Sequence, residues 1–544
     1  MANMRNDYFR SKYRLFTNFK MDVDQCLRMI EDKYDFKFKD KQEESIKAIV
    51  QFNDTFVTLP TGYGKSSIYF YLPEIFEALT GEKSSIVVIS PLQALMLDQV
   101  QKLEKLSITS VVVGEIQKDK GVGQKISEGQ FSIVFSSPEA ALTSGMWRKN
   151  LTSGVFHDRV KAVVIDEAHC ITEWGGEFRK EYDRLNELRS VFPEKTAFVA
   201  LTATATQTMR MEIMKKLQMI RNDTRTVSLL PDRPNVIYHM QKSNKKKEEL
   251  NWLLNDLKTN GKSSKKTIIY CRNIMSCADL YEHFCNEIEQ GNDLEKRMVA
   301  MFHRSTADTN KTHVLSQFPS YDTNLRVIFA TIAFGMGVDI PDIERVIHWG
   351  APRGLEQYSQ ESGRAGRDGR ESVSCVYYSG YDIAKNRCKE SVRDFCTTTK
   401  CLRMQLTSHF KLDDIASPSS GTRSSQPTSL CRCCSNCKVN CECGNCFSFH
   451  DENSSNDLFS REDDFLLGQF CGFLNEAVRE NLLDFYEFLV EEQKGRHLLF
   501  NSSMIETVVE NADFIFSEDD IVSLGLIDHN LAGDILELIA EVKD

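Results

Sequence analysis

Three short segments carry residue types that together can hydrolyse a nucleoside triphosphate. They are residues 60–66 (PTGYGKS), 166–169 (DEAH) and 360–367 (QESGRAGR). In the first segment, a glycine-flanked turn opening into a helix lets backbone amides approach phosphate, Lys65 adds a point charge, and the Ser66 hydroxyl can bind magnesium. We therefore predict a nucleotide site with a catalytic lysine. The predicted nucleotide-binding residues of this loop are Thr61, Gly62, Tyr63, Gly64, Lys65 and Ser66.

The phosphate loop departs from the strict pattern, which has a glycine where this chain has Leu59, so an ordinary glycine-rich turn is the alternative. The second segment favours function. Asp166 and Glu167 follow residues 162–165 (AVVI), an apolar run short enough to be a buried parallel strand, whose carboxyl end is where open α/β sheets bind ligands. We expect Asp166 to hold magnesium through water and Glu167 to polarise the attacking water. A solvated acidic loop is the alternative.

The two arginines of the third segment indicate a second lobe. Arg364 stands 299 positions after Lys65, far beyond one mononucleotide-binding unit. An arginine that reaches the γ-phosphate across a cleft accelerates hydrolysis by a factor on the order of 10³ to 10⁵ and makes hydrolysis depend on cleft closure. We predict that Arg364 and Arg367 are catalytic; surface salt bridges are the alternative. Three neighbouring glycines indicate a backbone that passes close to other groups: Gly363, Gly366 and Gly369.

Residues 34–437 resemble the RecQ family of DNA helicases in helicase superfamily 2. Five further segments occur in the family's order: 38–42 (FKDKQ), 90–99 (SPLQALMLDQ), 201–206 (LTATAT), 268–271 (IIYC) and 330–339 (ATIAFGMGVD). The resemblance implies that Gln42 reads adenine, although the family's usual arginine is Lys39, and that Arg367 is the arginine finger. It also implies that residues 201–206 link hydrolysis to strand binding. Further residues implied to bind nucleotide are Gly335, Asp339 and Gln360, and those implied to contact DNA are Pro91 and Gln99.

The segment after the acidic motif, CITEWGGEFRKEY, resembles the aromatic-rich loop of the same family. Trp174 and Phe178 can stack on bases, a contact worth ~1 to 3 kcal/mol each, and Arg179 can meet phosphate. A place in the hydrophobic core is the alternative for the two aromatic residues. The loop departs from the family at Gly176 and Glu177, where a histidine and an aspartate are usual.

Composition fits a multidomain protein that binds a phosphate backbone. The 544 residues are 41% hydrophobic and 27% charged, enough for about three to four domains, with no apolar run long enough to span a membrane and no secretory signal core at the start. The net charge of −11 is unevenly distributed. Residues 447–544 carry 23 acidic and 5 basic side chains, a net of −18, whereas residues 1–446 carry 62 basic and 55 acidic, a net of +7. The predicted motor is therefore mildly basic.

Apolar strand-like runs alternate with helical stretches, which predicts an α/β fold with parallel sheets. The runs are residues 85–89, 132–135 and 197–200 in a first lobe, and 267–270, 327–330 and 346–348 in a second. With the resemblance, we expect two tandem RecA-like lobes. The predicted divisions are an N-terminal segment (1–33), lobe 1 (34–229), lobe 2 (230–395), a zinc-binding module with a flexible insert (396–446) and an acidic helical tail (447–544).

Seventeen cysteines without an export signal indicate a reducing compartment, where metal binding is favoured over disulfides. A tetrahedral zinc site needs four soft ligands, and Cys401 with the spacing Cys431-x-x-Cys434-x-x-Cys437 can supply them. The motif resembles the zinc module that follows the motor in RecQ helicases, and we expect its role to be structural. Cys433 can replace Cys431, and the spacing does not decide between them.

Three more cysteines, Cys441, Cys443 and Cys446, can form part of another metal site but lack an evident fourth partner, so reactive or structural thiols are the alternative. The tail beyond them has apolar residues at helical spacing, which predicts a small acidic bundle. It does not resemble the basic winged helix of many family members. Either strand separation relies on the lobes alone, or the tail binds a protein partner.

We therefore expect an ATP-dependent translocase that uses Mg²⁺ and Zn²⁺, tracks along single-stranded DNA and unwinds duplex DNA. The resemblance implies that it moves 3′ to 5′. The resemblance also implies a nuclear protein of DNA repair and recombination, and the lack of a long apolar run predicts no membrane partner. An RNA-directed helicase is one alternative, although the aromatic loop and zinc cysteines disfavour it. The other is a catalytically weak DNA-binding scaffold whose acidic tail recruits partners.

Overall fold

A computed structural model describes most of residues 21–446, together with Val508 and Leu536. Within the main range, the stretches it leaves undescribed are 115–116, 120, 153, 174–178, 220–223, 245, 289–295, 332–333, 335–339, 386, 413–428 and 444–445. The predicted acidic tail lies outside the described residues except at two positions. It stays a prediction, as does the flexible insert.

Lobe 1 is built on a seven-stranded sheet with the order β3-β4-β2-β5-β6-β1-β7, in which all neighbouring strands are parallel. The strands are β1 (Thr55–Thr58), β2 (Ser85–Ile89), β3 (Ser110–Val113), β4 (Ile133–Ser136), β5 (Val160–Ile165), β6 (Ala197–Thr202) and β7 (Arg225–Ser228). The helices are α2 (Val23–Tyr34), α3 (Asp40–Ile49), α4 (Ser66–Phe70), α5 (Leu72–Thr80), α6 (Gln93–Lys105), α7 (Val122–Ser127), α8 (Pro138–Leu142), α9 (Gly145–Leu151), α10 (Gly154–Arg159), α11 (Cys170–Glu173), the 3₁₀ segment η2 (Lys180–Ser190) and α12 (Gln207–Lys216).

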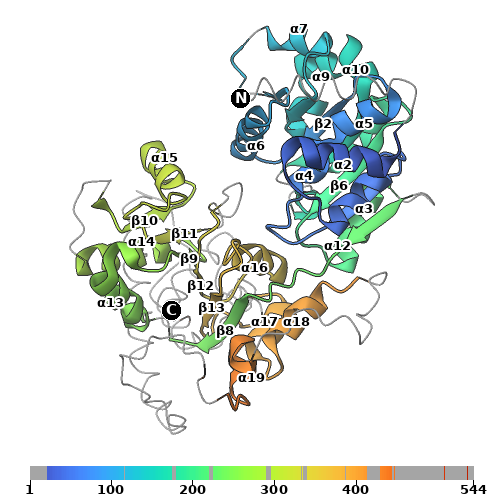
Figure 1. The fold of residues 1–544 in the computed structure, drawn as a ribbon. Helices are drawn as coiled ribbons and strands as arrows, with labels where there is room; N and C mark the ends of the chain where they lie inside the picture. The colour runs from blue at the N-terminus through green and yellow to red at the C-terminus, as the bar shows by residue number, and fades with distance from the viewer. Residues whose placement is uncertain are drawn as a thin grey trace.

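Lobe 2 repeats this architecture with six parallel strands in the order β10-β11-β9-β12-β13-β8. The strands are β8 (Val236–Lys242), β9 (Thr267–Cys271), β10 (Val299–Phe302), β11 (Val327–Ala330), β12 (Arg345–Trp349) and β13 (Ser372–Tyr378). The helices are η3 (Lys247–Leu250), α13 (Asn251–Asn260), η4 (Gly261–Ser263), α14 (Ile274–Glu287), α15 (Asp308–Gln317) and α16 (Leu355–Ser362). Figure 1 shows the lobes side by side, with the chain crossing from β7 to β8.

Each sheet is buried on both faces, which explains why its strands are continuous apolar runs rather than alternating ones. In β1, Val57 packs into one hydrophobic cluster of lobe 1 and Phe56 into the other, on the opposite face. In β9, Ile268 and Ile269 divide in the same way between the two clusters of lobe 2. The six strand-like runs predicted from the sequence all coincide with strands, so the α/β prediction is confirmed.

Lobe 1 includes more of the N-terminal region than expected. α2 begins after Asp22, whose side chain accepts a hydrogen bond from the backbone of Gln25 in a capping box. Its buried residues Cys26, Leu27 and Ile30 belong to the same cluster as Val57 of the central strand β1. The helix lies within the predicted N-terminal segment, yet it packs as part of the lobe because its apolar face needs that core.

A cysteine-rich module follows lobe 2 and packs on its edge. It comprises α17 (Glu390–Thr397), α18 (Leu402–His409), η7 (Leu430–Arg432) and α19 (Ser435–Lys438). The Tyr238 amide of edge strand β8 donates to the Cys433 carbonyl at 3.3 Å, and the Met240 amide donates to Ser435 Oγ at 3.2 Å. The module thus covers an edge that would otherwise present unpaired backbone groups. Within the described residues, no helix has the length and apolar character needed to cross a membrane.

Candidate active site

The phosphate-loop segment forms a tight backbone turn between β1 and α4. Gly62 and Gly64 have φ angles of 78° and 89°, a region that glycine adopts without steric cost. Gln42 Nε2 donates to the carbonyls of Tyr63 at 3.1 Å and Gly64 at 2.8 Å, and a Cβ atom on Gly64 would lie 2.7 Å from that nitrogen. Gln42, predicted to read adenine, therefore supports the loop directly. Its Oε1 atom accepts from the Lys39 amide at 2.8 Å.

Lys65 and the two carboxylates share one partly buried site at the carboxyl ends of β1 and β5. Lys65 Nζ donates to the Leu59 carbonyl at 3.1 Å, and burial lowers its pKa while Glu167 and Asp166 act in the opposite direction. Burial raises the pKa of Asp166, and the neighbouring Glu167 adds to the effect. The site thus concentrates charge out of water, where a bound cation and phosphates would interact with it strongly.

The oxygen groups here suit a hard divalent cation. Asp166 Oδ2 accepts from the Tyr69 hydroxyl at 3.2 Å, and Oδ1 accepts from the Glu167 amide at 3.0 Å, so the carboxylate is held in place. Ser66, at the start of α4, lines the same cavity as Asp166. A carboxylate, a hydroxyl and nucleotide phosphates are the ligands that magnesium takes in such sites, with water completing the shell.

Glu167 adopts a strained backbone conformation, with a φ of 50°. Such strain in a non-glycine residue persists only where surrounding structure enforces it and is concentrated at functional sites. Its Oε2 atom is buried and accepts no hydrogen bond from the described residues. His169 Nδ1 lies 3.3 Å away, but its hydrogen bond is with Thr202 Oγ1 at 3.2 Å. Glu167 therefore retains an acceptor for a ligand or water.

A cavity of roughly 390 Å³ joins this site to lobe 2. Its lobe 1 wall includes Lys65 and Glu167, and its lobe 2 wall includes Gln360, Arg364 and Arg367. The fold therefore brings together the catalytic residues predicted from segments 299 positions apart. Arg367 also lowers the pKa of Lys65 through charge repulsion, which reflects their proximity.

The arginine segment passes against the phosphate loop, as its glycines predict. Thr61 Oγ1 donates to the Gly363 carbonyl at 3.2 Å, and a Cβ atom on Gly363 would lie 2.3 Å from that hydroxyl oxygen. Gly366 has a φ of 59°, and a Cβ there would lie 2.4 Å from Asn235 Nδ2. Neither position has room for a side chain without movement of backbone or neighbours.

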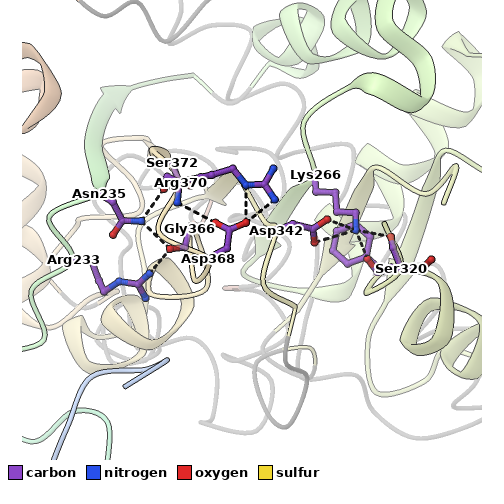
Figure 2. A network of polar contacts seen from close by, with 10 residues as sticks. Arg233, Asn235, Lys266, Ser320, Asp342, Gly366, Asp368, Arg370 and Ser372 are labelled. Atoms are coloured by element: carbon purple, nitrogen blue, oxygen red, sulfur yellow. Dashed lines mark hydrogen bonds and ion pairs between the residues drawn. The ribbon is translucent and has the colours of Figure 1, made fainter. Parts of the chain in front are cut away.

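Arg233, in the crossing between lobes, ties these segments together, and sequence reasoning did not identify it as a site residue. Its Nη1 donates to the Gly363 carbonyl at 2.8 Å and the Thr61 carbonyl at 3.4 Å, and its Nη2 donates to the Gly366 carbonyl at 2.7 Å. Figure 2 shows Arg233 and Asn235 converging on Gly366. The only feature of the sequence that could have indicated this role is the presence of an arginine in the short polar segment between β7 and β8.

Gln360 of α16 bridges the cleft to lobe 1. Its Nε2 atom donates to Thr204 Oγ1 at 3.0 Å and lies 3.4 Å from His169 Nε2. Sequence comparison with the family implied a nucleotide contact, and the residue does line the cavity, but its described hydrogen bonds go to protein groups. Residues 201–206, expected to link hydrolysis to strand binding, thereby contact both the acidic motif and lobe 2.

The structure places the predicted DNA-contacting residues that it describes within lobe 1, and their contacts with DNA stay predictions. Arg179 forms a two-pronged ion pair with Glu139, at 2.7 Å for both Nε and Nη2, and donates from Nη1 to the Pro91 carbonyl at 2.7 Å. Its guanidinium is thus engaged within lobe 1 rather than presented to phosphate. Gln99 is buried on the wall of the inter-lobe cavity, and Pro91 is buried. The remaining predicted residues, Trp174, Phe178, Gly335 and Asp339, lie outside the described residues.

A second cavity, of roughly 670 Å³, lies in lobe 2 where β9 and β12 end. Four basic residues contribute to its wall: Arg272, Arg353, Arg387 and Lys389. Arg353 and Lys389 are exposed, whereas Arg272 is partly buried and donates to the Arg387 carbonyl at 3.0 Å. This concentration of positive charge at the carboxyl edge of a parallel sheet is suited to an anionic ligand.

The cysteines form two groups, and their membership corrects the predicted one. Cys401, Cys433, Cys434 and Cys437 have all their sulfur atoms within 4.8 Å of one another. Cys431, predicted as a ligand of this group, belongs instead to a group with Cys441, Cys443 and Cys446. The 3₁₀ turn η7 carries Cys431 away, while Cys433 lies 3.6 Å from Cys401, sulfur to sulfur. Spacing alone could not determine which of the two faces α18.

Two protein-family models match the chain. One, described as DEAD/DEAH box helicase, matches residues 39–212, and one described as Helicase conserved C-terminal domain matches residues 245–369. These 174 and 125 residues amount to 299 of the 544. The first model lies within lobe 1 and the second within lobe 2, and together they include all three catalytic segments, while α2, β7, β8 and β13 lie outside the matched residues.

Curated relatives are similar over about two thirds of the chain. The RecQ-like DNA helicase BLM of Xenopus laevis is 32% identical over 399 residues, covering 69% of this chain and 28% of that protein. The ATP-dependent DNA helicase RecQ of Pasteurella multocida is 33% identical over 351 residues, covering 64% of this chain and 51% of that protein. The chain therefore spans between a quarter and about half of the length of these relatives.

Among solved structures, the DUF1998 helicase MrfA bound to DNA matches with a TM-score of 0.52 and 16% sequence identity. The match covers 66% of this chain and 51% of that one. At this identity the likeness shows the shared two-lobed fold alone.

Proposed function

This chain belongs to the RecQ family of superfamily 2 helicases, and on that premise we propose that it is an ATP-dependent DNA helicase. The observation that carries the proposal is the inter-lobe cavity, where Lys65 and Glu167 of lobe 1 face Arg364 and Arg367 of lobe 2. A site divided between two lobes makes hydrolysis sensitive to their separation, and this sensitivity is the basis of a motor.

In this proposal, lobe 1 binds the nucleotide. The loop amides between Thr61 and Ser66 and the Lys65 ammonium hold the phosphates. Gln42, which donates to the Tyr63 and Gly64 carbonyls of the loop, is proposed to read adenine, as the family resemblance implies. Ser66 and Asp166 would hold magnesium, which supplies charge neutralisation between the β- and γ-phosphates. The desolvation of Asp166 favours this role, because a cation would stabilise its ionised form.

Glu167 and the arginines act on the reaction itself. Glu167 has a buried oxygen available to orient and polarise the attacking water, held there by the strained backbone at the end of β5. Arg367 is proposed as the finger that stabilises charge on the transferring phosphoryl group, with Arg364 beside it. Both arginines belong to lobe 2, so their contribution depends on its position.

Coupling to DNA passes through residues that contact both lobes. Gln360 joins Thr204 and His169, and His169 lies beside the proposed catalytic Glu167. A strand that draws lobe 2 towards lobe 1 would therefore change the surroundings of the catalytic water. Trp174, tethered to the same acidic motif, is proposed to stack on bases, together with Phe178.

The proposed substrate is single-stranded DNA, on which the chain moves 3′ to 5′ and unwinds duplex ahead of it. The basic cavity of lobe 2 supports contact with the phosphate backbone, as does the net charge of +7 over residues 1–446. By family, we propose a nuclear location and a role in DNA repair and recombination. The acidic tail is proposed to bind a protein partner.

The group formed by Cys401, Cys433, Cys434 and Cys437 is proposed to hold a structural zinc ion. Four soft sulfur ligands within 4.8 Å of one another suit a closed tetrahedral site. The amides of Leu402 and Cys437 donate to Cys434 Sγ at 3.4 Å each, contacts that favour its thiolate form. Such a zinc would fasten α18 to β8, since Cys433 also accepts from the β8 backbone.

The decisive experiment measures ATP hydrolysis by the full chain without nucleic acid, with single-stranded DNA and with RNA of matched length and sequence. Lys65→Ala is the control. Strong stimulation by DNA that the control lacks is expected. Stimulation by RNA alone would favour an RNA-directed helicase, and no stimulation by either strand would favour the scaffold alternative.

A second assay addresses movement and its direction. Partial duplexes with either a 3′ or a 5′ single-stranded overhang are incubated with ATP, and strand separation is followed. The proposal expects unwinding of the 3′-overhang substrate. Preference for the 5′ overhang would contradict the direction, and hydrolysis without separation of either would contradict duplex unwinding.

A further inference from the structure

A second group of four cysteines lies beside the first and has no role in the helicase proposal. Cys431, Cys441, Cys443 and Cys446 have all their sulfur atoms within 4.8 Å of one another. The distances from Cys443 Sγ to Cys431 Sγ and Cys446 Sγ are both 3.6 Å. We propose that this group is a second structural zinc site, which makes the module binuclear.

The distances distinguish a single metal ion from other uses of four thiols. Zinc–sulfur bonds of 2.3 Å in a tetrahedral arrangement place the sulfur atoms about 3.8 Å apart, close to the 3.6 Å found here. A disulfide requires about 2.05 Å. An iron–sulfur cluster separates its cysteine ligands more widely, because iron and sulfide atoms lie between them. The geometry therefore favours one tetrahedrally coordinated ion.

The ligand chemistry selects the kind of ion. Four thiolates disfavour magnesium and calcium, which take oxygen ligands, and favour zinc among the metals that accept a closed tetrahedral sulfur site. Ser429 Oγ lies 3.2 Å from Cys431 Sγ, where its hydroxyl can donate to a metal-bound thiolate. Cys431 is thus the fourth ligand of the second site, which the sequence did not identify for Cys441, Cys443 and Cys446, and Ser429 supports it by a hydrogen bond.

The two groups are interleaved along the chain. In the second group, Cys431 precedes the ligands Cys433, Cys434 and Cys437 of the first group along the chain, and the other three cysteines follow them. A turn joins the groups, because the Asn440 amide donates to the Cys437 carbonyl at 3.2 Å. A metal in the second site would therefore close a loop around part of the first site and restrict its movement.

Burial predicts that the sites exchange metal at different rates. Cys433 and Cys434 of the first site are buried, at 7% and 0% exposure. In the second site only Cys431 is buried, at 2%, and Cys443 is exposed. A chelator should therefore remove metal from the second site first.

The test begins with the metal content of the full, reduced chain by mass spectrometry of its elements. Two zinc ions per chain are expected. Cys443→Ser combined with Cys446→Ser should leave one, as should Cys401→Ser by emptying the other site, and Cys285→Ser, a cysteine of α14 outside both groups, should leave two. One zinc in the unaltered chain, two zinc in the double variant, or iron in place of zinc would overturn the proposal.

A second measurement avoids dependence on variants that fail to fold. Zinc release from the unaltered chain to a chelating dye should occur in two phases of equal amplitude, the faster from the second site. Replacement by ¹¹³Cd should likewise give two resonances in the region of four-sulfur coordination. Release of only one zinc ion per chain in a single phase, or a single ¹¹³Cd resonance, would contradict a second zinc site. Either result would leave the proposed zinc at Cys401, Cys433, Cys434 and Cys437 unaffected.

Discussion

The two lobes share one sheet architecture but place their charged residues differently. At the carboxyl edge of its sheet, lobe 1 gathers the buried Asp166 and the partly buried Lys65 and Glu167 beside the phosphate loop. Lobe 2 has an open basic cavity at the corresponding edge, and its two arginines come from the segment after α16 instead. The same parallel fold therefore positions, in lobe 1, the residues proposed to act on the nucleotide and its attacking water. In lobe 2 it positions arginines whose proposed contribution depends on how close the two lobes are.

The largest expected effect comes from removing the contribution of lobe 2. Arg367→Ala should lower the DNA-stimulated hydrolysis rate by a factor on the order of 10³, because charge on the transferring phosphoryl group loses its partner. Binding of a fluorescent ATP analogue should change only a few-fold. Arg364→Ala is the matched comparison. A larger effect from Arg364 would reassign the finger within the same segment.

The corresponding change in lobe 1 should be next in size. Glu167→Gln keeps the shape of the side chain but removes its charge, and we expect hydrolysis to fall by about 10² with nucleotide binding retained. Single-turnover kinetics will separate the rate of hydrolysis from the affinity for the nucleotide. Retained hydrolysis would show that the buried oxygen of Glu167 does not serve the attacking water and would leave catalysis mainly to lobe 2.

Removing the link between lobes should have a smaller effect that is specific to coupling. Arg233→Ala loses charge-assisted hydrogen bonds to Gly363 and Gly366, each worth about 1.5–3 kcal/mol. Because water can replace part of this loss, we expect the coupling to change by about the lower value of one bond, so that stimulation by DNA falls ~10-fold. Arg233→Lys keeps the charge but not the forked geometry, and should recover part of the stimulation. Equal loss of basal and stimulated hydrolysis would instead indicate a general loss of folding, to be checked by thermal unfolding.

The smallest effect is expected for the contact across the cleft at Gln360. Gln360→Ala removes a neutral hydrogen bond to Thr204 worth about 0.5–1.5 kcal/mol, which corresponds to ~2- to 10-fold in stimulation. The double variant with Thr204→Ala should then be no worse than either single variant. Additive effects would mean that the residues act separately, and that Gln360 serves the nucleotide as the family resemblance implied.

The fold and the catalytic segments were predictable because each depends on contiguous residues. Apolar runs become buried parallel strands, and the residues after them reach the ligand-binding edge, as at Asp166 and Glu167. The close approach of the arginine segment was likewise signalled by Gly363 and Gly366. The order of the segments carried the resemblance to RecQ helicases, and the similarity of the chain to curated RecQ helicases confirmed that resemblance.

Residues with more than one possible partner were not predictable in the same way. Arg179 has the chemistry to meet phosphate, yet in the fold it pairs with Glu139, a residue 40 positions away. From the sequence, Arg233 was only an arginine in the segment between the lobes; the fold brings four backbone carbonyl groups to its guanidinium. Long cationic side chains reach many places, so their partners depend on tertiary packing.

Taken alone, the sequence determined two parallel α/β lobes, the phosphate loop, the paired carboxylates and the distant arginines, because local pattern and spacing define each of them. Only the tertiary structure decided which cysteines belong together, since Cys431 and Cys433 differ by two positions but face different sulfur groups. It also decided how the lobes are joined at Arg233 and Gln360. Such contacts depend on the positions of segments far apart in the chain, which no local pattern specifies.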